Sequence, residues 1–266
     1  MTDPRFETWI EDLQRRYLAD LEFSELVRAL KALSSRYVER RAQLTERTAL
    51  DTAGKRAAYA LYYSPLHFLT VRHIVSELSA VNEGLTLLDL GCGAGACGAA
   101  WGSLAAREVI GVDSHPWAIG EAPHAYRRFG LKVDVRRSSV ARLSLPRTAD
   151  AIVTGWVVNE VDAPSRAALL KTLIGAASAG VGLLVLEPIA TRVAPWWAEW
   201  ARAFDQVGGR SDEWRFPIQL PDWLARLDRA AGMQHDELTA RSIYVAPSNK
   251  RAGASNALGK RRGGYR

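Results

Sequence analysis

The feature that most constrains the fold is an apolar run that ends in a glycine-rich turn. Leu85 to Leu90 is typical of a buried strand, and glycines follow at alternate positions, 91, 93 and 95. Small residues come next, from Ala96 to Ala100, as at the start of a helix that packs closely on a sheet. A strand, a glycine turn and a helix together form a ligand-binding cradle at the carboxyl edge of a parallel sheet.

From this strand onward, predicted strands alternate with predicted helices. The pattern predicts strands over residues 86–90, 108–113, 131–136, 149–155 and 181–187, and helices over 95–105, 116–129, 164–178 and 221–232. Such alternation indicates an α/β fold of the Rossmann-like, doubly wound type, with helices on both faces of the sheet. Two late strands are expected over 232–238 and 242–246, antiparallel to each other because only a few residues separate them.

The chain divides into an N-terminal helical extension over 1–80, a ligand-binding domain over 81–247 and a basic tail over 248–266. In the extension, apolar side chains recur at helical spacing from Phe6 to Leu21 and again from Leu26 to Tyr37. A short helix is expected over 55–63. Ser64 and Pro65 then offer an N-cap and a first-turn proline for another helix over about 65–78.

The positive charge of the chain is concentrated in its tail. The sequence holds 35 Lys and Arg against 29 Asp and Glu, and six of the cations lie between 248 and 266, where there is no acid. The remainder is therefore balanced in charge. A tail with so little apolar content is not expected to fold alone. It is either a solubilising end or a contact to RNA or a ribosome through phosphate groups.

Residues 189–220 interrupt the alternation and are interpreted as a tryptophan-rich insertion. They hold Trp196, Trp197, Trp200 and Trp214 among several arginines. Such aromatic residues can stack on unpaired bases while the arginines meet phosphates. The favoured interpretation is that the tryptophans form the apolar face of a helix on the sheet, because acidic residues lie nearby.

Composition points to a cytoplasmic protein without a metal centre. The two cysteines, Cys92 and Cys97, form no disulfide framework, and no Cys or His cluster suggests a zinc site. The sequence has no apolar run of about 18 residues, so no membrane span is predicted. The first residues are polar and acidic, unlike a signal peptide.

Two cofactors compete for the glycine turn. Gly93-Ala-Gly-Ala-Cys-Gly98 matches a dinucleotide pattern, with Asp113 at the expected distance for a ribose contact. Asp89 argues against a dinucleotide, because a carboxylate beside the turn would repel a pyrophosphate bound at the helix N-terminus. S-adenosylmethionine (SAM) has no phosphate and carries a positive amino group and sulfonium. Asp89 therefore favours SAM, and Asp113 can accept hydrogen bonds from both of its ribose hydroxyls.

The same residues resemble those of a known family. Leu88-Asp-Leu-Gly-Cys-Gly-Ala-Gly95 is similar to the first signature of class I SAM-dependent methyltransferases, and Val112-Asp113 to the second. The resemblance implies a seven-stranded sheet of order 3-2-1-4-5-7-6 with strand 7 antiparallel. The acid of the third signature is missing from Arg136-Arg-Ser-Ser-Val140. The residues implied to hold SAM are Asp89, Gly91, Cys92, Gly93, Gly95, Asp113, Ser114, Ser139, Val140 and Trp156.

The segment after the fourth strand carries the candidates for the methyl acceptor site. In class I methyltransferases this position faces the methyl group, and here it holds Asn159 and Glu160. Methyl transfer is an in-line displacement that needs alignment more than acid–base chemistry. A carboxylate helps only if the acceptor must lose a proton. The alternative is that both residues simply begin the next helix as a cap and a first-turn acid.

A second resemblance concerns the acceptor. Ala57-Ala-Tyr-Ala-Leu-Tyr-Tyr-Ser-Pro65, Val158-Asn-Glu-Val161 and Leu184-Val-Leu-Glu-Pro188 are similar to segments of the Rsm22-like methyltransferases of the small ribosomal subunit. The chain lacks the cysteine-rich region of that family. The likeness implies rRNA or another ribosome-associated substrate. The alternatives are a non-catalytic SAM-binding ribosome-assembly factor, a small-molecule methyltransferase and an NAD-dependent oxidoreductase.

Overall fold

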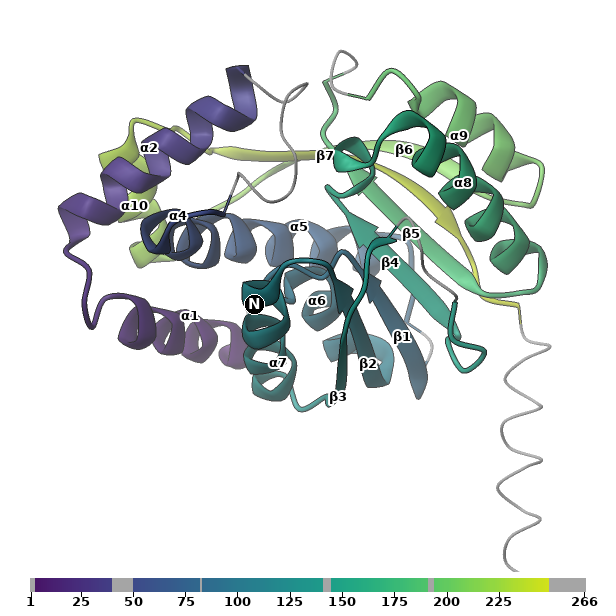
Figure 1. Cartoon of the computed structure of the whole chain (residues 1–266), viewed down its shortest axis with the longest axis horizontal. Helices are drawn as coiled ribbons and strands as arrows, with labels where there is room; N and C mark the ends of the chain where they lie inside the picture. The colour runs from purple at the N-terminus through teal and green to yellow at the C-terminus, as the bar shows by residue number, and fades with distance from the viewer. Residues whose placement is uncertain (1–2, 40–49, 82, 141–144, 191–193, 249–266) are drawn as a thin grey trace, which may run out of the picture.

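The computed structural model describes residues 3–39, 50–81, 83–140, 145–190 and 194–248 (Figure 1). The basic tail falls, except for Ser248, outside this part of the chain. In chain order the elements are α1 (Pro4–Tyr17), α2 (Phe23–Glu39), α4 (Ala53–Ala58), the π-helical turn η2 (Tyr59–Tyr63), α5 (Ser64–Glu77), β1 (Leu85–Leu90), α6 (Ala96–Ala105), β2 (Ala106–Asp113), α7 (Pro116–Arg128), β3 (Lys132–Arg137), β4 (Ala151–Gly155), the 3-10 turn η4 (Val158–Glu160), α8 (Ala163–Ser178), β5 (Gly182–Glu187), α9 (Trp197–Asp205), β6 (Arg210–Pro217), α10 (Asp222–Ala231) and β7 (Glu237–Val245).

A seven-stranded sheet of order β3-β2-β1-β4-β5-β7-β6 forms the centre of the molecule. β7 runs antiparallel to both of its neighbours, and the pairs among β1 to β5 are parallel. The Rossmann-like fold class and the strand order implied by the sequence are confirmed. The strands predicted between residues 86 and 187 and the helices predicted between 95 and 232 are all present.

Side chains of β1 alternate between the two faces of the sheet. Leu87 packs into a core that holds α5, α6 and α7, whereas Leu88 and Leu90 pack into a second core beneath α8 and α9. Since successive strand side chains point to opposite faces, a strand with apolar side chains on both faces needs cover on both sides. Figure 1 shows the two helical layers on either side of the sheet.

The N-terminal helices share the first of these cores. Phe6 of α1 stacks on Phe68 of α5 with ring centroids 4.9 Å apart, and Phe68 stacks on Phe129 at 4.6 Å. α10 lies beside α2, far from the sheet (Figure 1), and Phe23 meets Trp223 edge to face. The long strands β6 and β7 reach from the sheet to this helical group. The extension therefore covers one side of the sheet's carboxyl edge.

Two expectations about the last strands were wrong. The two late strands are one continuous strand, β7, and its partner β6 falls inside the segment interpreted as an insertion. β6 is an edge strand whose side chains are mostly exposed, so it needs neither an apolar run nor alternation. Within β7, the charged Arg241 interrupts the apolar pattern although its side chain is buried. The packing interpretation of the tryptophans is confirmed for Trp196, Trp197 and Trp200, which are buried around α9.

The expected break between two helices near Ser64 is also absent. α4, η2 and α5 follow one another directly, and Ser64 has helical backbone angles. Its buried Oγ has no hydrogen-bond partner among the described residues, so it is no N-cap. The π turn adds one residue to a helical turn, a feature that is frequent at functional sites. It carries Tyr59, Tyr62 and Tyr63.

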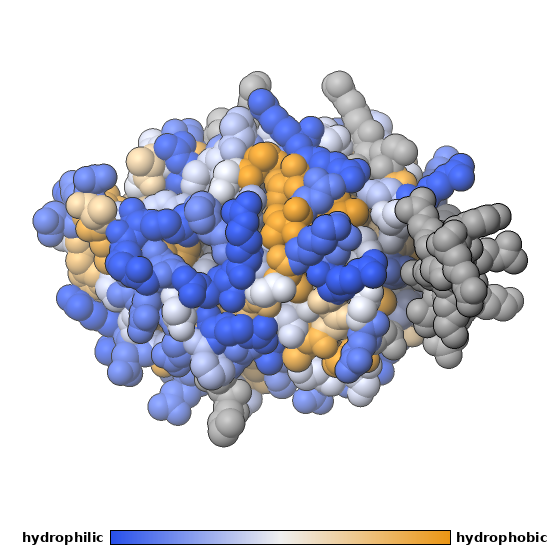
Figure 2. All heavy atoms as spheres, turned by 90° about the horizontal axis from the view of Figure 1, so that it is seen from below, coloured by the Kyte–Doolittle hydropathy of each residue, from blue (hydrophilic) through white to orange (hydrophobic). Residues whose placement is uncertain are grey.

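An apolar interface requires large hydrophobic side chains that are exposed on the surface of the molecule. The face in Figure 2 is mainly hydrophilic, with an apolar strip across its middle. Among the described residues, Val81 is the one large hydrophobic residue with an exposed side chain, at 45%. No described helix combines the length and the apolar character that a bilayer span requires.

Candidate active site

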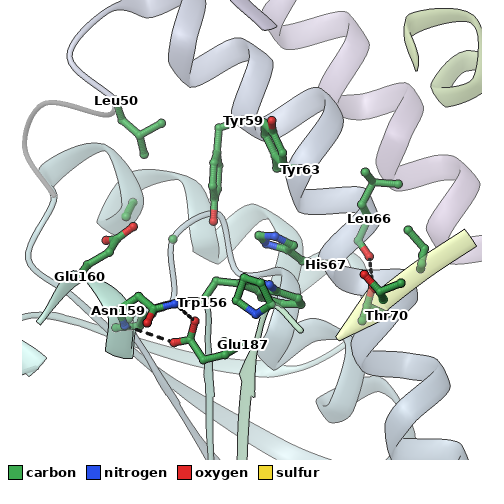
Figure 3. A pocket seen from close by; sticks show the side chains of 18 of the residues that line it. Leu50, Tyr59, Tyr63, Leu66, His67, Thr70, Trp156, Asn159, Glu160 and Glu187 are labelled. Carbon is green, nitrogen blue, oxygen red and sulfur yellow. Dashed lines mark hydrogen bonds between the residues drawn. The ribbon is translucent and has the colours of Figure 1, made fainter. Parts of the chain in front are cut away.

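A cavity of about 280 Å³ lies between the N-terminal helices and the carboxyl ends of the parallel strands. One end is lined by Gly91, Gly93, Asp113 and His115, and the other by His235, Glu237, Leu238 and Thr239. Figure 3 shows Tyr59, Tyr63 and His67 reaching in from η2 and α5, opposite Trp156, Asn159 and Glu187. The cavity thus extends from the glycine turn to the start of β7.

The glycine turn has a backbone that only glycine adopts readily. Gly91, Gly93 and Gly95 have φ values of +72°, +50° and +84°, in the left-handed region that L side chains rarely occupy. At Gly91 a Cβ would lie 2.3 Å from Cγ2 of Val157, and at Gly95 one would lie 2.9 Å from the carbonyl oxygen of Ala122. Two of the three positions therefore also lack the space for a side chain.

Five amides of this turn and of the first turn of α6 (Ala96–Ala105) are paired within the protein. The amides of Gly91 and Cys92 both donate to the Val112 carbonyl, and the amide of Gly95 donates to the Cys92 carbonyl. The amide of Gly93 donates to Asp113 Oδ2, and that of Gly98 to Asp89 Oδ2. All five distances are between 2.7 and 3.0 Å. A pyrophosphate binds a glycine turn through amides that point at the ligand. These five amides are therefore not directed at a phosphate group in the cavity.

Asp89 lies beneath the turn instead of at its mouth. Its side chain is buried, and Oδ2 accepts hydrogen bonds from Gly98 N at 2.7 Å and from the Tyr126 hydroxyl at 2.8 Å. Burial raises the pKa of Asp89 to about 7. The expectation that this carboxylate meets a cationic ligand at the cavity surface is therefore corrected: Asp89 fixes the turn to α6 and α7.

Asp113, at the end of β2, lines the cavity as predicted. Its Oδ2 accepts from Gly93 N and its Oδ1 from His115 N, both at 2.8 Å. Burial raises the pKa of this carboxyl above its usual range, and the two backbone hydrogen bonds oppose that shift. Because each carboxylate oxygen can accept more than one hydrogen bond, capacity remains for the two ribose hydroxyls of SAM.

Five other predicted cofactor residues do not reach the described cavity wall: Cys92, Gly95, Ser114, Ser139 and Val140. Cys92 and Val140 are buried in the two cores, where their side chains pack against the sheet. Burial raises the pKa of the Cys92 thiol well above its usual value, so the thiol stays protonated. The predicted cofactor contacts of these five residues therefore find no support in the lining of the cavity.

Trp156 is held in a strained conformation at the centre of the cavity. Its φ is +60°, which costs an L residue about 1–2 kcal/mol. Its ring stacks on His67 at 3.8 Å between centroids and 6° between planes (Figure 3). The strained backbone turns the indole into the cavity, and strain of this kind concentrates at functional sites. Trp156 is therefore placed where the sequence predicted a contact, although its partner His67 was missed.

Asn159 is held in place from two sides. Its Nδ2 donates to Glu187 Oε2 at 2.5 Å, and its Oδ1 accepts from Trp196 Nε1 at 2.9 Å. Glu187, fully buried at the end of β5, also accepts from Asn159 N at 3.3 Å. Asn159 and Glu160 both line the cavity. Glu187 was missed as a site residue. The signal was present, because it ends an apolar strand in the same way as Asp89.

The electrostatics of the cavity are acidic. Its described lining contains the carboxyl groups of Asp113, Glu160, Glu187 and Glu237, and no lysine or arginine. Within the described part of the chain, no group of three or more His, Cys, Asp or Glu side chains is placed to hold a metal ion. The cavity therefore suits ligands that are neutral or positively charged.

Comparison with known proteins agrees with this geometry. Residues 87–180 match the family model described as a methyltransferase domain. This part of the chain is a methyltransferase domain. SAM is its cofactor, and the turn, Asp113 and the acidic wall fit it. No curated protein sequence matches the chain at a significant level.

The chain is also similar, at low identity, to several solved structures. One is a SAM-dependent methyltransferase from Aquifex aeolicus, at 18% identity and a TM-score of 0.47, over 69% of this chain and 93% of that one. Another is the N-methyltransferase NodS from Bradyrhizobium japonicum, at 16% and 0.47, over 69% and 98%. A third is magnesium protoporphyrin IX methyltransferase from Synechocystis with bound S-adenosylhomocysteine, at 16% and 0.46, over 69% and 84%. Likeness at this level carries no information about the acceptor.

Proposed function

We propose that this protein transfers the methyl group of SAM to a small acceptor bound in the half of the cavity lined by Trp156, His67 and His235. The observation that supports this most is the continuity of the cavity. Gly91, Gly93 and Asp113 line one end, and the aromatic residues of η2 and α5 line the middle. A cofactor held at the turn and an acceptor held under the tyrosines would share one enclosed space.

The chain's own residues position the reactants. SAM, when bound, supplies an electrophilic methyl carbon on a cationic sulfonium. Asp113 accepts hydrogen bonds from the ribose, and the side-chain-free surface of Gly91 and Gly93 allows close approach. Trp156 and His67 offer a flat surface to the acceptor, and the helices above it exclude water. Alignment of this kind is the main catalytic requirement of an in-line displacement.

The acceptor class follows from the charges on the wall. Four carboxyl groups without a described lysine or arginine would repel a phosphate group that entered the cavity. Flat aromatic side chains favour a planar acceptor, since planar rings stack on one another as His67 and Trp156 do. A planar, neutral or cationic small molecule is therefore the acceptor that this cavity favours.

An RNA acceptor is the second candidate, and a different surface supports it. Arg15 and Arg16 at the end of α1 face Arg127 and Arg128 at the end of α7 across a groove of about 420 Å³. Asp12 and Glu121 pair with three of these arginines, so part of the charge is neutralised. Together with the six cations of residues 248–266, the groove could meet an RNA backbone while a single unpaired base enters the cavity.

The test uses an extract from cells that lack the protein. Purified protein and methyl-labelled SAM are added, and the label is separated by size and by sensitivity to nuclease. Label in small, nuclease-resistant molecules supports the first candidate, and label in nuclease-sensitive polymer supports RNA. The matched control is Asp113→Ala, which should lose the label with either acceptor. SAM binding by calorimetry without any labelled product would instead indicate a non-catalytic SAM-binding protein.

A further inference from the structure

A histidine and a buried aspartate form a pair at the far end of the cavity. His235 lies between α10 and β7 and lines the cavity wall. Its Nδ1 is 2.7 Å from Oδ1 of Asp228, and its backbone N–H donates to Oδ2 of the same carboxyl at 3.2 Å. Asp228 belongs to α10 and is 5% exposed. The Tyr62 hydroxyl of η2 also donates to Asp228 and lies 2.8 Å from His235 Nδ1.

This arrangement determines where the imidazole proton sits. A carboxylate only accepts hydrogen bonds, so Nδ1 of His235 must carry the proton that it shares with Asp228. The neutral ring then has its lone pair on Nε2. Among the described residues, every hydrogen bond of the ring is made through Nδ1. Nε2 is therefore the nitrogen available to a molecule in the cavity.

We infer that His235 is the general base of the reaction, with Asp228 as the positioning residue that fixes its tautomer. The inference rests on the proposed function. The proton of an acceptor O–H or ring N–H passes to Nε2, and the acceptor atom forms a bond to the methyl carbon. The sulfur–carbon bond breaks with its electron pair on sulfur, which leaves neutral S-adenosylhomocysteine. The acceptor is therefore a planar molecule whose reacting atom bears a hydrogen.

A purely structural role of His235 would not require its Nε2 atom. Holding the loop before β7 requires only the backbone N–H and a donor at the place of Nδ1, both of which bond Asp228. An asparagine supplies such a donor and has no basic nitrogen. His235→Asn therefore keeps the loop contact and removes the base, which separates the two roles.

Several titratable groups surround the His235 ring. The titratable groups around it are Asp228 from α10 and Tyr62 from η2, with Glu237 of β7, Tyr63 of η2 and His67 of α5 along the same cavity wall. A general base acts only while its nitrogen is unprotonated, so methyl transfer should fall at acid pH and reach a plateau at higher pH.

The experiment measures single-turnover transfer of label from SAM to the labelled fraction of the cell extract, from pH 5.5 to 9. His235→Asn should lower the plateau rate by about 10²- to 10⁴-fold, the usual effect of a general base, and should remove the fall at low pH. Its SAM affinity and melting temperature should match those of the wild type. Asp228→Asn, which frees the tautomer, should also slow transfer and should shift the low-pH limb.

Nitrogen NMR of the histidines gives a readout that needs no acceptor. At the pH of the activity plateau, His235 should show a protonated Nδ1 and an unprotonated Nε2, and Asp228→Asn should abolish this preference. A protonated Nε2 in the wild type overturns the inference. Labelling that His235→Asn leaves unchanged refutes the base role alone. If the wild type labels no fraction, the proposed function fails, and the base role fails with it.

Discussion

Substitution of Gly91 by alanine tests whether the glycine turn is fixed by its neighbours or only by its own backbone. Gly91 has a φ of +72°, and a Cβ there would lie 2.3 Å from Cγ2 and 2.7 Å from Cγ1 of Val157. Val157 follows directly after the strained Trp156 and is itself buried. The clash is therefore with a packed side chain that has little room to move.

The expected cost has two parts. A left-handed alanine costs about 1–2 kcal/mol, and overpacking of a buried site costs about 1–3 kcal/mol. Val157→Ala alone removes two buried methyl groups, at about 1–3 kcal/mol by the usual cost of such deletions. In the double variant Gly91→Ala/Val157→Ala the overpacking disappears, because the new Cβ occupies the space that the removed methyl groups left. The double variant should therefore be about 1–3 kcal/mol more stable than the sum of the single costs.

The assay is urea unfolding of the four proteins, with SAM affinity by calorimetry as a second readout. The matched control is Gly93→Ala. Gly93 also has a positive φ, but its Cβ would meet only the movable Tyr59 hydroxyl, at 2.9 Å. Gly93→Ala should carry the backbone cost alone, and its combination with Val157→Ala should be additive. Additive costs in the Gly91 cycle would refute the idea that Val157 constrains the turn.

Three further predictions follow from the same site. Asp113→Ala should weaken SAM binding by about 1–3 kcal/mol, the scale of lost hydrogen bonds to a charged group, as measured by calorimetry. Burial raises the pKa of Asp89 to about 7 from its ordinary value of 3.8, so its contribution to the unfolding free energy is present below about pH 4 and lost as pH rises through 7. Urea unfolding of the ligand-free wild type should show this loss, and Asp89→Asn should show less of it. At Trp156, whose φ is +60°, the glycine variant should be about 1 kcal/mol more stable than the alanine variant, the reverse of the usual order. Equal or reversed melting temperatures of that pair would mean that the residue is not strained.

The fold could be predicted because its signals are local and periodic. Apolar runs of strand length separated by amphipathic helices leave few alternatives to a parallel sheet. The edge strand β6 was missed because it lacks such a local, periodic signal. It is solvated on most of its length, so no burial pattern marks it in the sequence. The continuous helix through Ser64 was missed because a serine before a proline is a good local cap, and packing of η2 overrode that local preference.

The candidate site was predicted in outline and corrected in its detail. Asp113, Trp156 and Asn159 line the cavity as their positions implied. Asp89 was identified as important, but its role depends on Tyr126, a residue 37 positions away that holds the carboxylate beneath the turn. Spacing along a strand cannot say which of two faces, or which depth, a single acid will occupy once helices are packed on it.

By itself the sequence determined the strand, turn and helix of the cofactor site, because positive φ values at close backbone approach leave only glycine. It also determined the sheet to which that turn belongs. Only the tertiary structure decided which groups meet in the cavity. Glu187 meets Asn159 across 28 residues, and His235 meets Tyr62 across 173. Such contacts depend on how separate elements pack, and packing is a property of the whole chain that no local pattern of residues contains.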